Sequence, residues 1–382
     1  MIISDAIRYV GVFDQDIDLF EGQYAVPTGV SYNSYIIFDE KIAVMDSVDS
    51  RKTDEWLKNV QEALNGKQPD YLVVQHLEPD HSGSIQALAN LYPEMKLIMS
   101  AKAQAMLPQF VDAALAARVQ AVKENETLSL GTHTLRFFTA PMVHWPEVIV
   151  TYEESEKILF SADAFGTFGH PESGEWLPEA RRYYINIVGK YGSPVSTLLK
   201  KAASLDIQVI CPLHGPVLKE NLGFYLGKYQ TWASYAPEEK GTLVAFGTLH
   251  GNTGKAARLM ADELKALGET VTLIDLARDD MALAVAEAFR FDKLVLACPT
   301  YDGNFFPKME DFLLHLKAKA FQKRKVALIE NGSWAPMAAK GMKAYLEQMK
   351  DIAVCDTVVT IKSTVSEANK AQIKALAQEL VG

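Results

Sequence analysis

The sequence predicts a protein of two α/β domains, and three observations support this prediction. The chain has 382 residues, which is more than a single hydrophobic core usually contains. Residues 241–382 alternate strictly between strand-like and helix-like segments, whereas residues 1–240 contain short strand-like runs with helical patterns between them. Hydrophobic residues make up 48% of the chain and charged residues 23%, as is typical of a globular protein.

Residues 241–382 are expected to form a doubly wound parallel sheet, because five strand–helix units follow one another. The expected strands are residues 243–246, 270–274, 293–297, 325–330 and 357–361. The expected helices are residues 253–267, 281–289, 307–320, 335–350 and 366–380. This pattern is typical of a flavodoxin-like sheet, which binds its ligand at the carboxyl ends of the strands.

Residues 1–240 are expected to form two sheets flanked by helices. Strands are expected at residues 34–38, 41–45 and 96–99, and helices at residues 53–64 and 101–117. Residues 236–241 are polar and contain both proline and glycine, which is typical of a linker. The predicted domains are therefore residues 1–240 and residues 241–382.

The densest group of possible metal ligands is the run His76-Leu77-Glu78-Pro79-Asp80-His81, which directly follows an apolar stretch. In an extended segment alternate residues point to the same side, so we expect His76, Glu78 and Asp80 to converge. His81 would then turn with the chain and serve a second metal. Imidazoles and carboxylates at this density need a compensating cation if they are buried.

An alternative interpretation is a polar loop in which Asp80 caps a helix that begins near Ser82. Three further residues of ligand type argue against this alternative, because each of them ends an apolar run: His144, Asp163 and His214. Loops at the ends of strands are where sites are usually built. The pattern therefore predicts one metal site made of seven residues.

The order of these seven residues resembles the metallo-β-lactamase superfamily, whose usual signature is His-x-His-x-Asp-His. Glu78 in place of the second histidine is similar to the flavodiiron protein branch, as are the segments 29–35, 144–147 and 161–169. This resemblance implies an αββα sandwich for the N-terminal domain and two non-haem iron ions. It also implies that His76, Glu78 and His144 hold one iron, that Asp80, His81 and His214 hold the other, and that Asp163 bridges them.

Carboxylate and imidazole ligands together suit iron better than zinc, although the residues by themselves leave zinc or a mixed pair of metals open.

In the C-terminal domain, three loops that follow strands suit a flavin phosphate and a flat ring. They resemble the FMN site of flavodoxins, with His250 in place of the usual hydroxyl residue and with a short fourth-strand loop. The candidate FMN contacts are Thr248, Leu249, His250, Gly251, Asn252, Thr253, Pro299, Thr300, Tyr301, Asp302, Gly303, Asn304, Asn331, Gly332, Ser333 and Trp334.

Composition and charge exclude several other classes of protein. The net charge of −10 argues against a nucleic-acid partner, and no run approaches the ~20 apolar residues of a membrane span. The N-terminus shows no secretory signal, so we expect a cytoplasmic protein. The cysteines, at positions 211, 298 and 355, are too far apart for a rubredoxin-type site.

The resemblance implies an oxidoreductase that reduces dioxygen to water, nitric oxide to nitrous oxide, or both. It also implies a head-to-tail homodimer or a homotetramer, and a separate electron donor such as rubredoxin or a reduced deazaflavin. One alternative is a metal-dependent hydrolase, and another is a flavin-bearing electron carrier with a degenerate metal site.

We expect structural roles for His133, His170 and His315, and Trp145 should form a wall of the metal pocket. One hydroxyl of Tyr183, Tyr184 and Tyr191 could reach that pocket.

Overall fold

The computed structural model describes residues 1–172 and 174–382, which form two compact units, Met1–Tyr229 and Gln230–Gly382. The division lies within helix α7 (Leu222–Ala233), and strand β16 begins at Glu239. The expected linker is therefore wrong for residues 239–241, which belong to a strand. No helix among the described residues combines the length and the apolar composition that crossing a bilayer requires.

The N-terminal unit contains two sheets that face each other. The first has the strand order β1 (Ile7–Tyr9), β6 (Tyr35–Ile37), β7 (Ala43–Met45), β8 (Tyr71–Val73), β9 (Lys96–Ser100) and β10 (Val119–Val122). The second has the order β11 (Thr127–Ser129), β12 (Thr134–Thr139), β13 (Ile149–Glu153), β14 (Ile158–Phe160) and β15 (Val209–Cys211). Two short pairs, β2 (Val12–Asp14) with β5 (Val30–Tyr32) and β3 (Leu19–Phe20) with β4 (Tyr24–Ala25), complete the unit.

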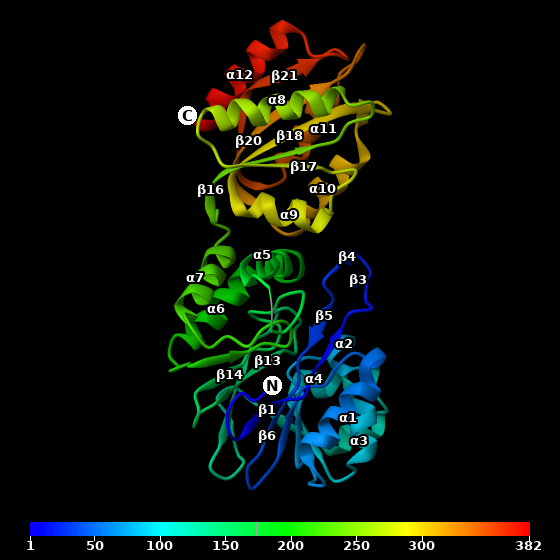
Figure 1. The fold of residues 1–382 in the computed structure, drawn as a ribbon, viewed down its shortest axis with the longest axis vertical. Helices are drawn as coiled ribbons and strands as arrows, with labels where there is room; N and C mark the ends of the chain where they lie inside the picture. The colour runs from blue at the N-terminus through cyan, green and yellow to red at the C-terminus, as the bar shows by residue number, and fades with distance from the viewer. Residues whose placement is uncertain (173) are drawn as a thin grey trace. The chain divides into compact units, whose positions relative to one another are not determined.

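Apolar side chains of both sheets form one core between them, which includes Tyr35, Met45, Ile98, Phe137 and Phe160. Helices α1 (Thr53–Leu64) and α3 (Ile85–Leu91) lie beside the first sheet, and α6 (Gly192–Ala202) lies on the other side of the unit, beside the second (Figure 1). The predicted αββα sandwich is confirmed. The core explains the short, fully apolar strands, because their side chains are buried on both faces.

The two predicted helices of this unit have different outcomes. The helix expected at residues 53–64 is α1, which buries Trp56, Val60 and Leu64 along one face and ends at Asn65 in the left-handed conformation. The single helix expected at residues 101–117 is wrong. The segment forms α4 (Ala101–Met106) and two 3₁₀ turns, with Pro108 in the first turn, where it supplies no backbone N–H.

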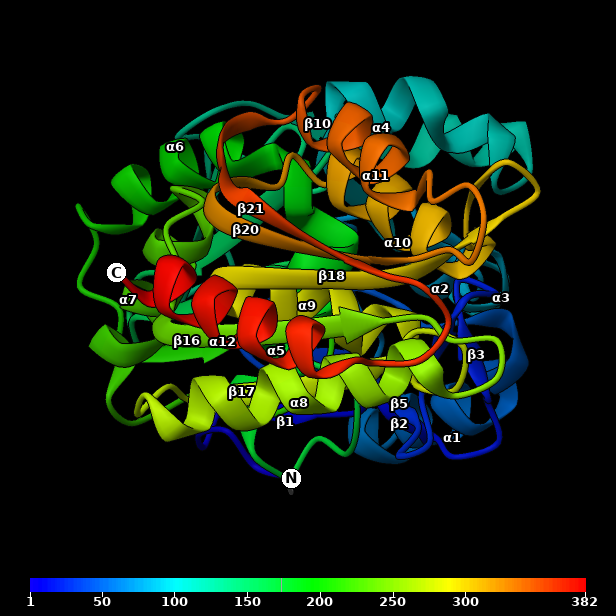
Figure 2. The same cartoon turned by 90° about the horizontal axis from the view of Figure 1, so that it is seen from above.

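The C-terminal unit is an open parallel sheet with the order β17 (Val271–Asp275), β16 (Glu239–Phe246), β18 (Phe291–Tyr301), β20 (Gln322–Asn331) and β21 (Lys350–Ile361). Helices α8 (Asn252–Ala266) and α12 (Glu367–Val381) cover one face (Figures 1 and 2). The opposite face carries α9 (Met281–Arg290), α10 (Pro307–Ala318) and α11 (Ala338–Leu346). The predicted doubly wound, flavodoxin-like sheet is confirmed.

The strand order places the topological switch point between β16 and β18, because the chain continues from them into helices on opposite faces. Alanines at 256, 257 and 261 let α8 pack closely on the sheet, where Met260 and Leu264 fill the core. The carboxyl ends of β16, β18 and β20 therefore lie side by side, and ligand loops follow these strands.

Candidate metal centre and flavin pocket

All seven predicted metal ligands lie on segments that follow strands. His76 and Glu78 follow β8, His144 follows β12, Asp163 follows β14, and His214 follows β15. Asp80 and His81 lie in the short helix α2 (Pro79–Ser82), which starts directly after Glu78. The parallel and antiparallel ladders of the two sheets thus bring four separate segments to one place.

Asp80 corrects the expectation that His76, Glu78 and Asp80 share one side of an extended segment. The extended backbone ends at Glu78, and the helical turn at Pro79 carries Asp80 toward a different group of ligands. The capping alternative is also wrong, because Asp80 lies inside the helix and neither of its carboxylate oxygens has a hydrogen-bond partner among the described residues.

The seven side chains gather in two neighbouring groups. In the first group the ligand atoms lie within 4.8 Å of one another, and its members are His76, Glu78, His144 and Asp163. In the second group the same limit holds for Asp80, His81 and His214. Each group is large enough to hold one metal ion, since protein sites usually supply three or four ligands per ion.

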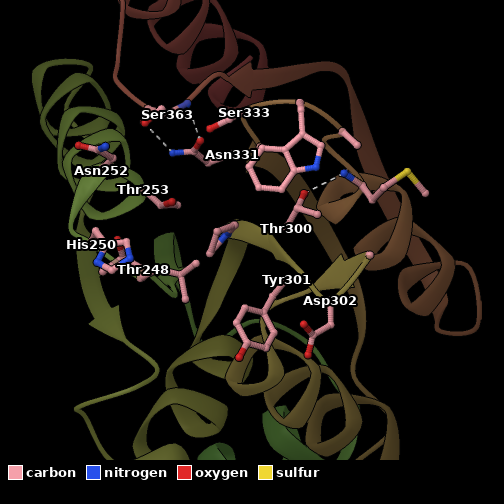
Figure 3. Close-up of a pocket in the computed structure, with 17 residues that line it drawn as sticks. Thr248, His250, Asn252, Thr253, Thr300, Tyr301, Asp302, Asn331, Ser333 and Ser363 are labelled. Carbon is pink, nitrogen blue, oxygen red and sulfur yellow. Dashed lines mark hydrogen bonds between the residues drawn. The ribbon is translucent and has the colours of Figure 1, made fainter.

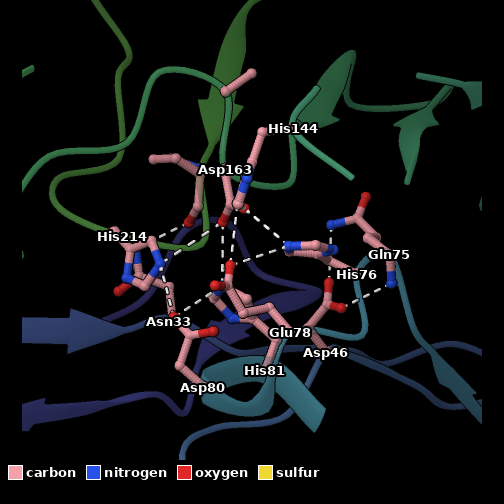
Figure 4. Close-up of polar contacts among 12 residues, drawn as sticks. Asn33, Asp46, Gln75, His76, Glu78, Asp80, His81, His144, Asp163 and His214 are labelled. Carbon is pink, nitrogen blue, oxygen red and sulfur yellow. Dashed lines mark hydrogen bonds and ion pairs between the residues drawn. The ribbon is translucent and has the colours of Figure 1, made fainter. Parts of the chain in front are cut away.

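The Asp163 carboxylate stands between the two groups (Figure 4). Its Oδ2 atom lies 3.3 Å from His144 Nε2 and 3.4 Å from His76 Nε2. Its Oδ1 atom lies 3.1 Å from His81 Nε2 and 3.6 Å from His214 Nε2. One oxygen therefore faces each group, as a carboxylate bridge between two metal ions requires.

The second candidate site is a cavity of about 580 Å³ at the carboxyl ends of β16, β18 and β20 (Figure 3). This volume lies within the usual range of pockets for small ligands and cofactors. All predicted flavin contacts line it except Gly251 and Asn304, which belong to the same loops. Three further lining residues were not predicted from the sequence: Ala335, Met337 and Ser363.

Comparisons with known proteins agree with both sites. Residues 30–215 match the ODP family beta lactamase model, and residues 243–377 match a flavodoxin domain. The coenzyme F₄₂₀H₂ oxidase of Methanothermobacter marburgensis is 30% identical over 84% of this chain and 82% of its own length. The chain belongs to the flavodiiron protein family.

Two further comparisons extend over almost the whole flavodiiron chain. The nitric oxide reductase of Moorella thermoacetica is 28% identical over 94% of this chain and 92% of its own length. The solved structure of rubredoxin oxygen:oxidoreductase from Desulfovibrio gigas superposes with a TM-score of 0.91 at 27% identity, covering 100% of this chain and 97% of that one. The match therefore includes the order of the two domains.

Two histidines of this flavodiiron protein are oriented through their outer nitrogens. His76 Nδ1 lies 2.8 Å from Glu147 Oε1, which also accepts a hydrogen bond from Leu77 N at 3.0 Å. His214 Nδ1 lies 2.8 Å from the backbone oxygen of Ser31. Because Nδ1 donates in both cases, Nε2 of each ring is unprotonated in the neutral side chain and free to bind a metal.

The buried pair of Asp46 and Gln75, next to the candidate ligand His76, was not predicted from the sequence. Asp46 accepts hydrogen bonds from Gln75 N at 2.7 Å and from Gln75 Nε2 at 2.8 Å, directly before the ligand His76. Burial raises the pKa of Asp46 to about 6, against the opposing effect of these hydrogen bonds. Its position at the end of β7 was the only local signal, because its partner lies 29 residues away.

The electrostatics of the site fit a pair of cations. Burial by itself would lower the pKa of His81, but the Asp80 and Asp163 carboxylates outweigh it and raise the pKa to about 9. Burial also opposes ionisation of Asp163, yet the neighbouring His81 and His76 hold its pKa well below the usual value. Within the described residues, both carboxylate oxygens of Asp80 and Asp163 and the Nε2 atoms of His81 and His214 are buried without a hydrogen-bond partner. Metal ligation would satisfy all of these atoms.

The structure selects one tyrosine at the metal centre. Tyr183 is fully buried, and its ring centre lies 5.5 Å from that of His214. Burial raises the pKa of the Tyr183 hydroxyl, and the charges of Asp163, Asp80 and Glu78 raise it further. Trp145 packs edge-to-face on His76 at 5.1 Å, as expected of a residue that walls the pocket.

A smaller cavity of about 320 Å³ reaches Glu78 and Asp80 from the protein surface. Its apolar lining comes from Ile17, Leu19 and Phe20, on and next to strand β3. The cavity thus offers a small molecule a partly apolar path to two of the candidate ligands.

The histidines assigned to structure lie away from both sites. His133 Nδ1 lies 2.8 Å from Asp39 Oδ2, and its Nε2 lies 3.1 Å from Glu156 Oε1. His170 packs on Phe13, and His315 lies 3.6 Å from Asp311. These contacts agree with structural roles.

Proposed function

We propose that this flavodiiron protein reduces dioxygen to water, nitric oxide to nitrous oxide, or both, with FMN and two non-haem iron ions as cofactors. One observation carries the proposal: seven candidate ligands, six of them buried and Glu78 half-buried, form two groups that share Asp163, in a chain that also carries a flavodoxin domain. Bound FMN supplies electrons one or two at a time, and the iron pair supplies the centre at which the oxidant is reduced.

The residues of the N-terminal domain would hold two metal ions and shield them from bulk water. Four imidazoles offer Nε2 atoms, and the carboxylates of Glu78, Asp80 and Asp163 offset most of the charge of two divalent ions. Carboxylates in this number favour iron over zinc. The half-buried ring of Trp145 and the buried ring of Tyr183 shield the ligands from bulk water. The apolar part of the lining of the smaller cavity, made by Ile17, Leu19 and Phe20, suits an uncharged diatomic substrate.

The residues of the C-terminal domain suit FMN. The loop from Thr248 to Thr253 leads into the N-terminus of α8, whose free N–H groups favour a phosphate. Thr300 Oγ1 accepts a hydrogen bond from Met337 N at 2.9 Å, which holds the two loops at the ring end of the cavity together. Tyr301 and Trp334 offer aromatic faces for the flavin ring.

The absorption spectrum and metal content of the purified protein test this function. We expect a yellow protein with about two iron ions and one FMN per chain, because each group of ligands holds one ion. A colourless protein with zinc would instead support the hydrolase alternative. A yellow protein without bound metal would support the electron-carrier alternative. Neither alternative explains both the flavodoxin domain and the complete ligand set.

The partners and the assembly belong to the same proposal. A separate electron donor such as rubredoxin or a reduced deazaflavin is supported by the printed names of two relatives, rubredoxin oxygen:oxidoreductase and coenzyme F₄₂₀H₂ oxidase. A homodimer or a dimer of dimers would place the flavin of one chain beside the metals of the other, and closed two-fold pairs are the commonest assembly. The cytoplasmic location stays a prediction; three buried free cysteines agree with a reducing compartment.

Mixed dimers test electron transfer between chains. One chain carries Asp163→Ala, and the other carries Thr248→Ala with Asn252→Asp, which places a carboxylate next to the expected phosphate. The mixed dimer should regain activity at its one intact pair of cofactors, while each parent dimer stays inactive. Inactive mixed dimers, with mixing confirmed by mass spectrometry, would mean that electrons pass within one chain.

A further inference from the structure

Two aromatic side chains hold the backbone of Phe165, which follows the candidate bridging ligand Asp163 by two residues. The N–H of Phe165 donates a hydrogen bond to the hydroxyl oxygen of Tyr229, and Trp176 Nε1 donates to the backbone oxygen of Phe165 at 3.1 Å. Burial raises the pKa of Tyr229 and the Asp163 carboxylate adds to this, against the opposing effect of the hydrogen bond from Phe165. Tyr229 therefore keeps its proton and lies within electrostatic reach of the metal centre.

The same aromatic group continues to the surface of the N-terminal unit. Trp176 is the first residue of α5 (Trp176–Tyr183), and its ring centre lies 6.5 Å from that of Tyr229 and 4.7 Å from that of Tyr225. Tyr225 and Tyr229 are four residues apart on α7, so they lie on the same face of that helix. Tyr229 and Trp176 are buried, whereas Tyr225 is half-buried and follows the exposed Phe224. The rings of Tyr229, Trp176 and Tyr225 thus form a row from the Asp163 loop to solvent.

A row of this composition can conduct electrons. Tyrosine and tryptophan lose one electron more readily than phenylalanine or any aliphatic side chain. Reduction of dioxygen to water takes four electrons, of which two ferrous ions supply two and reduced FMN supplies two. When the flavin is oxidised, a site that takes up dioxygen is two electrons short, and the surrounding protein becomes the reductant. Oxidation of the ligands themselves would then damage the site.

We propose that Tyr229, Trp176 and Tyr225 conduct electrons from the surface to the metal centre when reduced flavin is lacking, an inference that rests on the proposed function. In each event Trp176 gives one electron to the centre through the ring of Tyr229. Trp176 keeps its Nε1 proton, which stays hydrogen-bonded to Phe165 O. Tyr225 then returns one electron to Trp176 and loses its hydroxyl proton to water.

The resulting Tyr225 radical lies where a small molecule can reach it. A small thiol in solution restores Tyr225 by giving up the hydrogen atom of its S–H group. After two such events the two thiyl radicals combine into a disulfide, so the thiol is oxidised and the metal centre has gained two electrons. The oxidation therefore ends in a soluble thiol and spares the metal ligands.

The full-length protein loaded with ferrous iron tests the inference, once with reduced FMN and once after removal of the flavin. Each form is mixed with dioxygen in the presence of a nitroso spin trap, and mass spectrometry of the peptides locates the trapped radical. Freeze-quenched samples without the trap are measured by electron paramagnetic resonance. The form with reduced FMN is the internal control, because it holds all the electrons that the reaction needs.

Two variants interrupt the row, and one is a matched control. Trp176→Phe keeps an aromatic ring in place but removes the oxidisable indole, and Tyr225→Phe removes the end of the row at the surface. Tyr71→Phe changes another half-buried tyrosine, at the start of β8 and outside the row. Iron content and circular dichroism are measured for every variant.

Flavin-free wild type should form the adduct on Tyr225, and wild type with reduced FMN should not. Trp176→Phe should lose the adduct on Tyr225. Trp176→Phe and Tyr225→Phe should both show more oxidation of the ligand histidines than wild type, whereas Tyr71→Phe should match wild type. Glutathione added before mixing should remove the adduct from wild type.

An adduct on Tyr225 that persists in Trp176→Phe would overturn the inference, as would an equal adduct with and without reduced FMN. If Trp176→Phe binds less iron, Tyr225→Phe decides, and unchanged oxidation of its ligand histidines would overturn the inference. Wild type that binds iron but forms no adduct with dioxygen would overturn it and leave the proposed function standing. Wild type that binds no iron would contradict the proposed function itself.

Discussion

His76 Nδ1 and Glu147 Oε1 lie 2.8 Å apart, and neither side chain is exposed to solvent. Burial disfavours a charged carboxylate at Glu147, but the hydrogen bonds to His76 and Leu77 outweigh it and lower the pKa of Glu147. The charged carboxylate holds the proton of His76 on Nδ1, so Nε2 faces the other ligands of its group. Glu147 thus orients a candidate ligand although it belongs to neither ligand group itself.

Glu147→Gln should weaken metal binding in the group that contains His76. The amide keeps the shape of the side chain but lacks the charge that orients the imidazole, and changes of this kind typically cost about 10- to 100-fold in metal affinity. Competition with a chromophoric chelator measures the effect. Glu94→Gln, at an exposed site, is the control. Unchanged affinity in Glu147→Gln would contradict this role.

Metal binding should release protons and strengthen as the pH rises toward about 9. Burial by itself lowers the pKa of His144, but Asp163 and Glu78 outweigh it and raise the pKa to about 9, close to the pKa of His81. The metal-free site therefore holds both protons at neutral pH, and a metal ion must displace them. Calorimetry in buffers of different ionisation enthalpy counts these protons; metal binding that is independent of pH between about 6 and 9 would contradict the assignment.

The same protons should affect the stability of the metal-free protein in the opposite direction. Because the folded-state pKa of His81 and of His144 lies above the unfolded value of about 6.5, their stabilisation is complete below that value. It should be lost as the pH rises through about 9. Urea denaturation of the metal-free protein across this range measures the loss, and constant stability would show that the carboxylates do not hold these protons.

Asp163→Ala should reduce the content of both metals, because one carboxylate oxygen faces each group. Asp80→Ala is the matched comparison, since Asp80 belongs only to the group with His81 and His214 and should affect one metal. FMN content should be normal in both variants, and elemental analysis with flavin absorption measures all three cofactors. Full iron and full activity in Asp163→Ala would exclude the bridging role.

Glu78→His should shift the metal preference toward zinc. The substitution removes one of the three carboxylates and restores the histidine-rich ligand set that zinc prefers. Growth with both metals, followed by elemental analysis, gives the ratio of iron to zinc in wild type and variant. The same ratio in both proteins would mean that Glu78 does not govern metal choice.

The C-terminal unit should fold alone and bind FMN, and the fragment 230–382 should be more stable than 241–382. The buried Arg324 donates from Nη1 to Tyr235 O at 2.9 Å, and strand β16 begins at Glu239, so the shorter fragment loses an acceptor and the start of a strand. Nη1 keeps Gln322 O and Lys323 O as acceptors, so the loss of Tyr235 O should cost about one ordinary hydrogen bond, about 0.5–1.5 kcal/mol. Urea denaturation compares the two fragments; a folded but colourless 230–382 fragment would contradict the flavin assignment.

The sequence by itself determined the two-domain α/β architecture, the five strand–helix units after residue 241, and the identity of the candidate ligands. These features leave local signals. Helix α1 follows from the spacing of Trp56, Val60 and Leu64, and His76 and Glu78 stand directly after an apolar run. The predicted helix at residues 101–117 failed, because a proline within an otherwise helical pattern ended it early.

Only the tertiary structure decided which of these residues meet. A helical turn that begins at Pro79 places Asp80 beside His81 and His214, the grouping that the family resemblance implied and that an extended segment would not give. The structure also packs the ring of Tyr183 against that of His214. It also revealed Glu147 and Asp46, which lie 71 and 29 residues from their partners in the sequence. The physical reason is that hydrogen bonds across loops depend on the packing of two sheets, and such contacts between distant residues produce no periodic pattern along the chain.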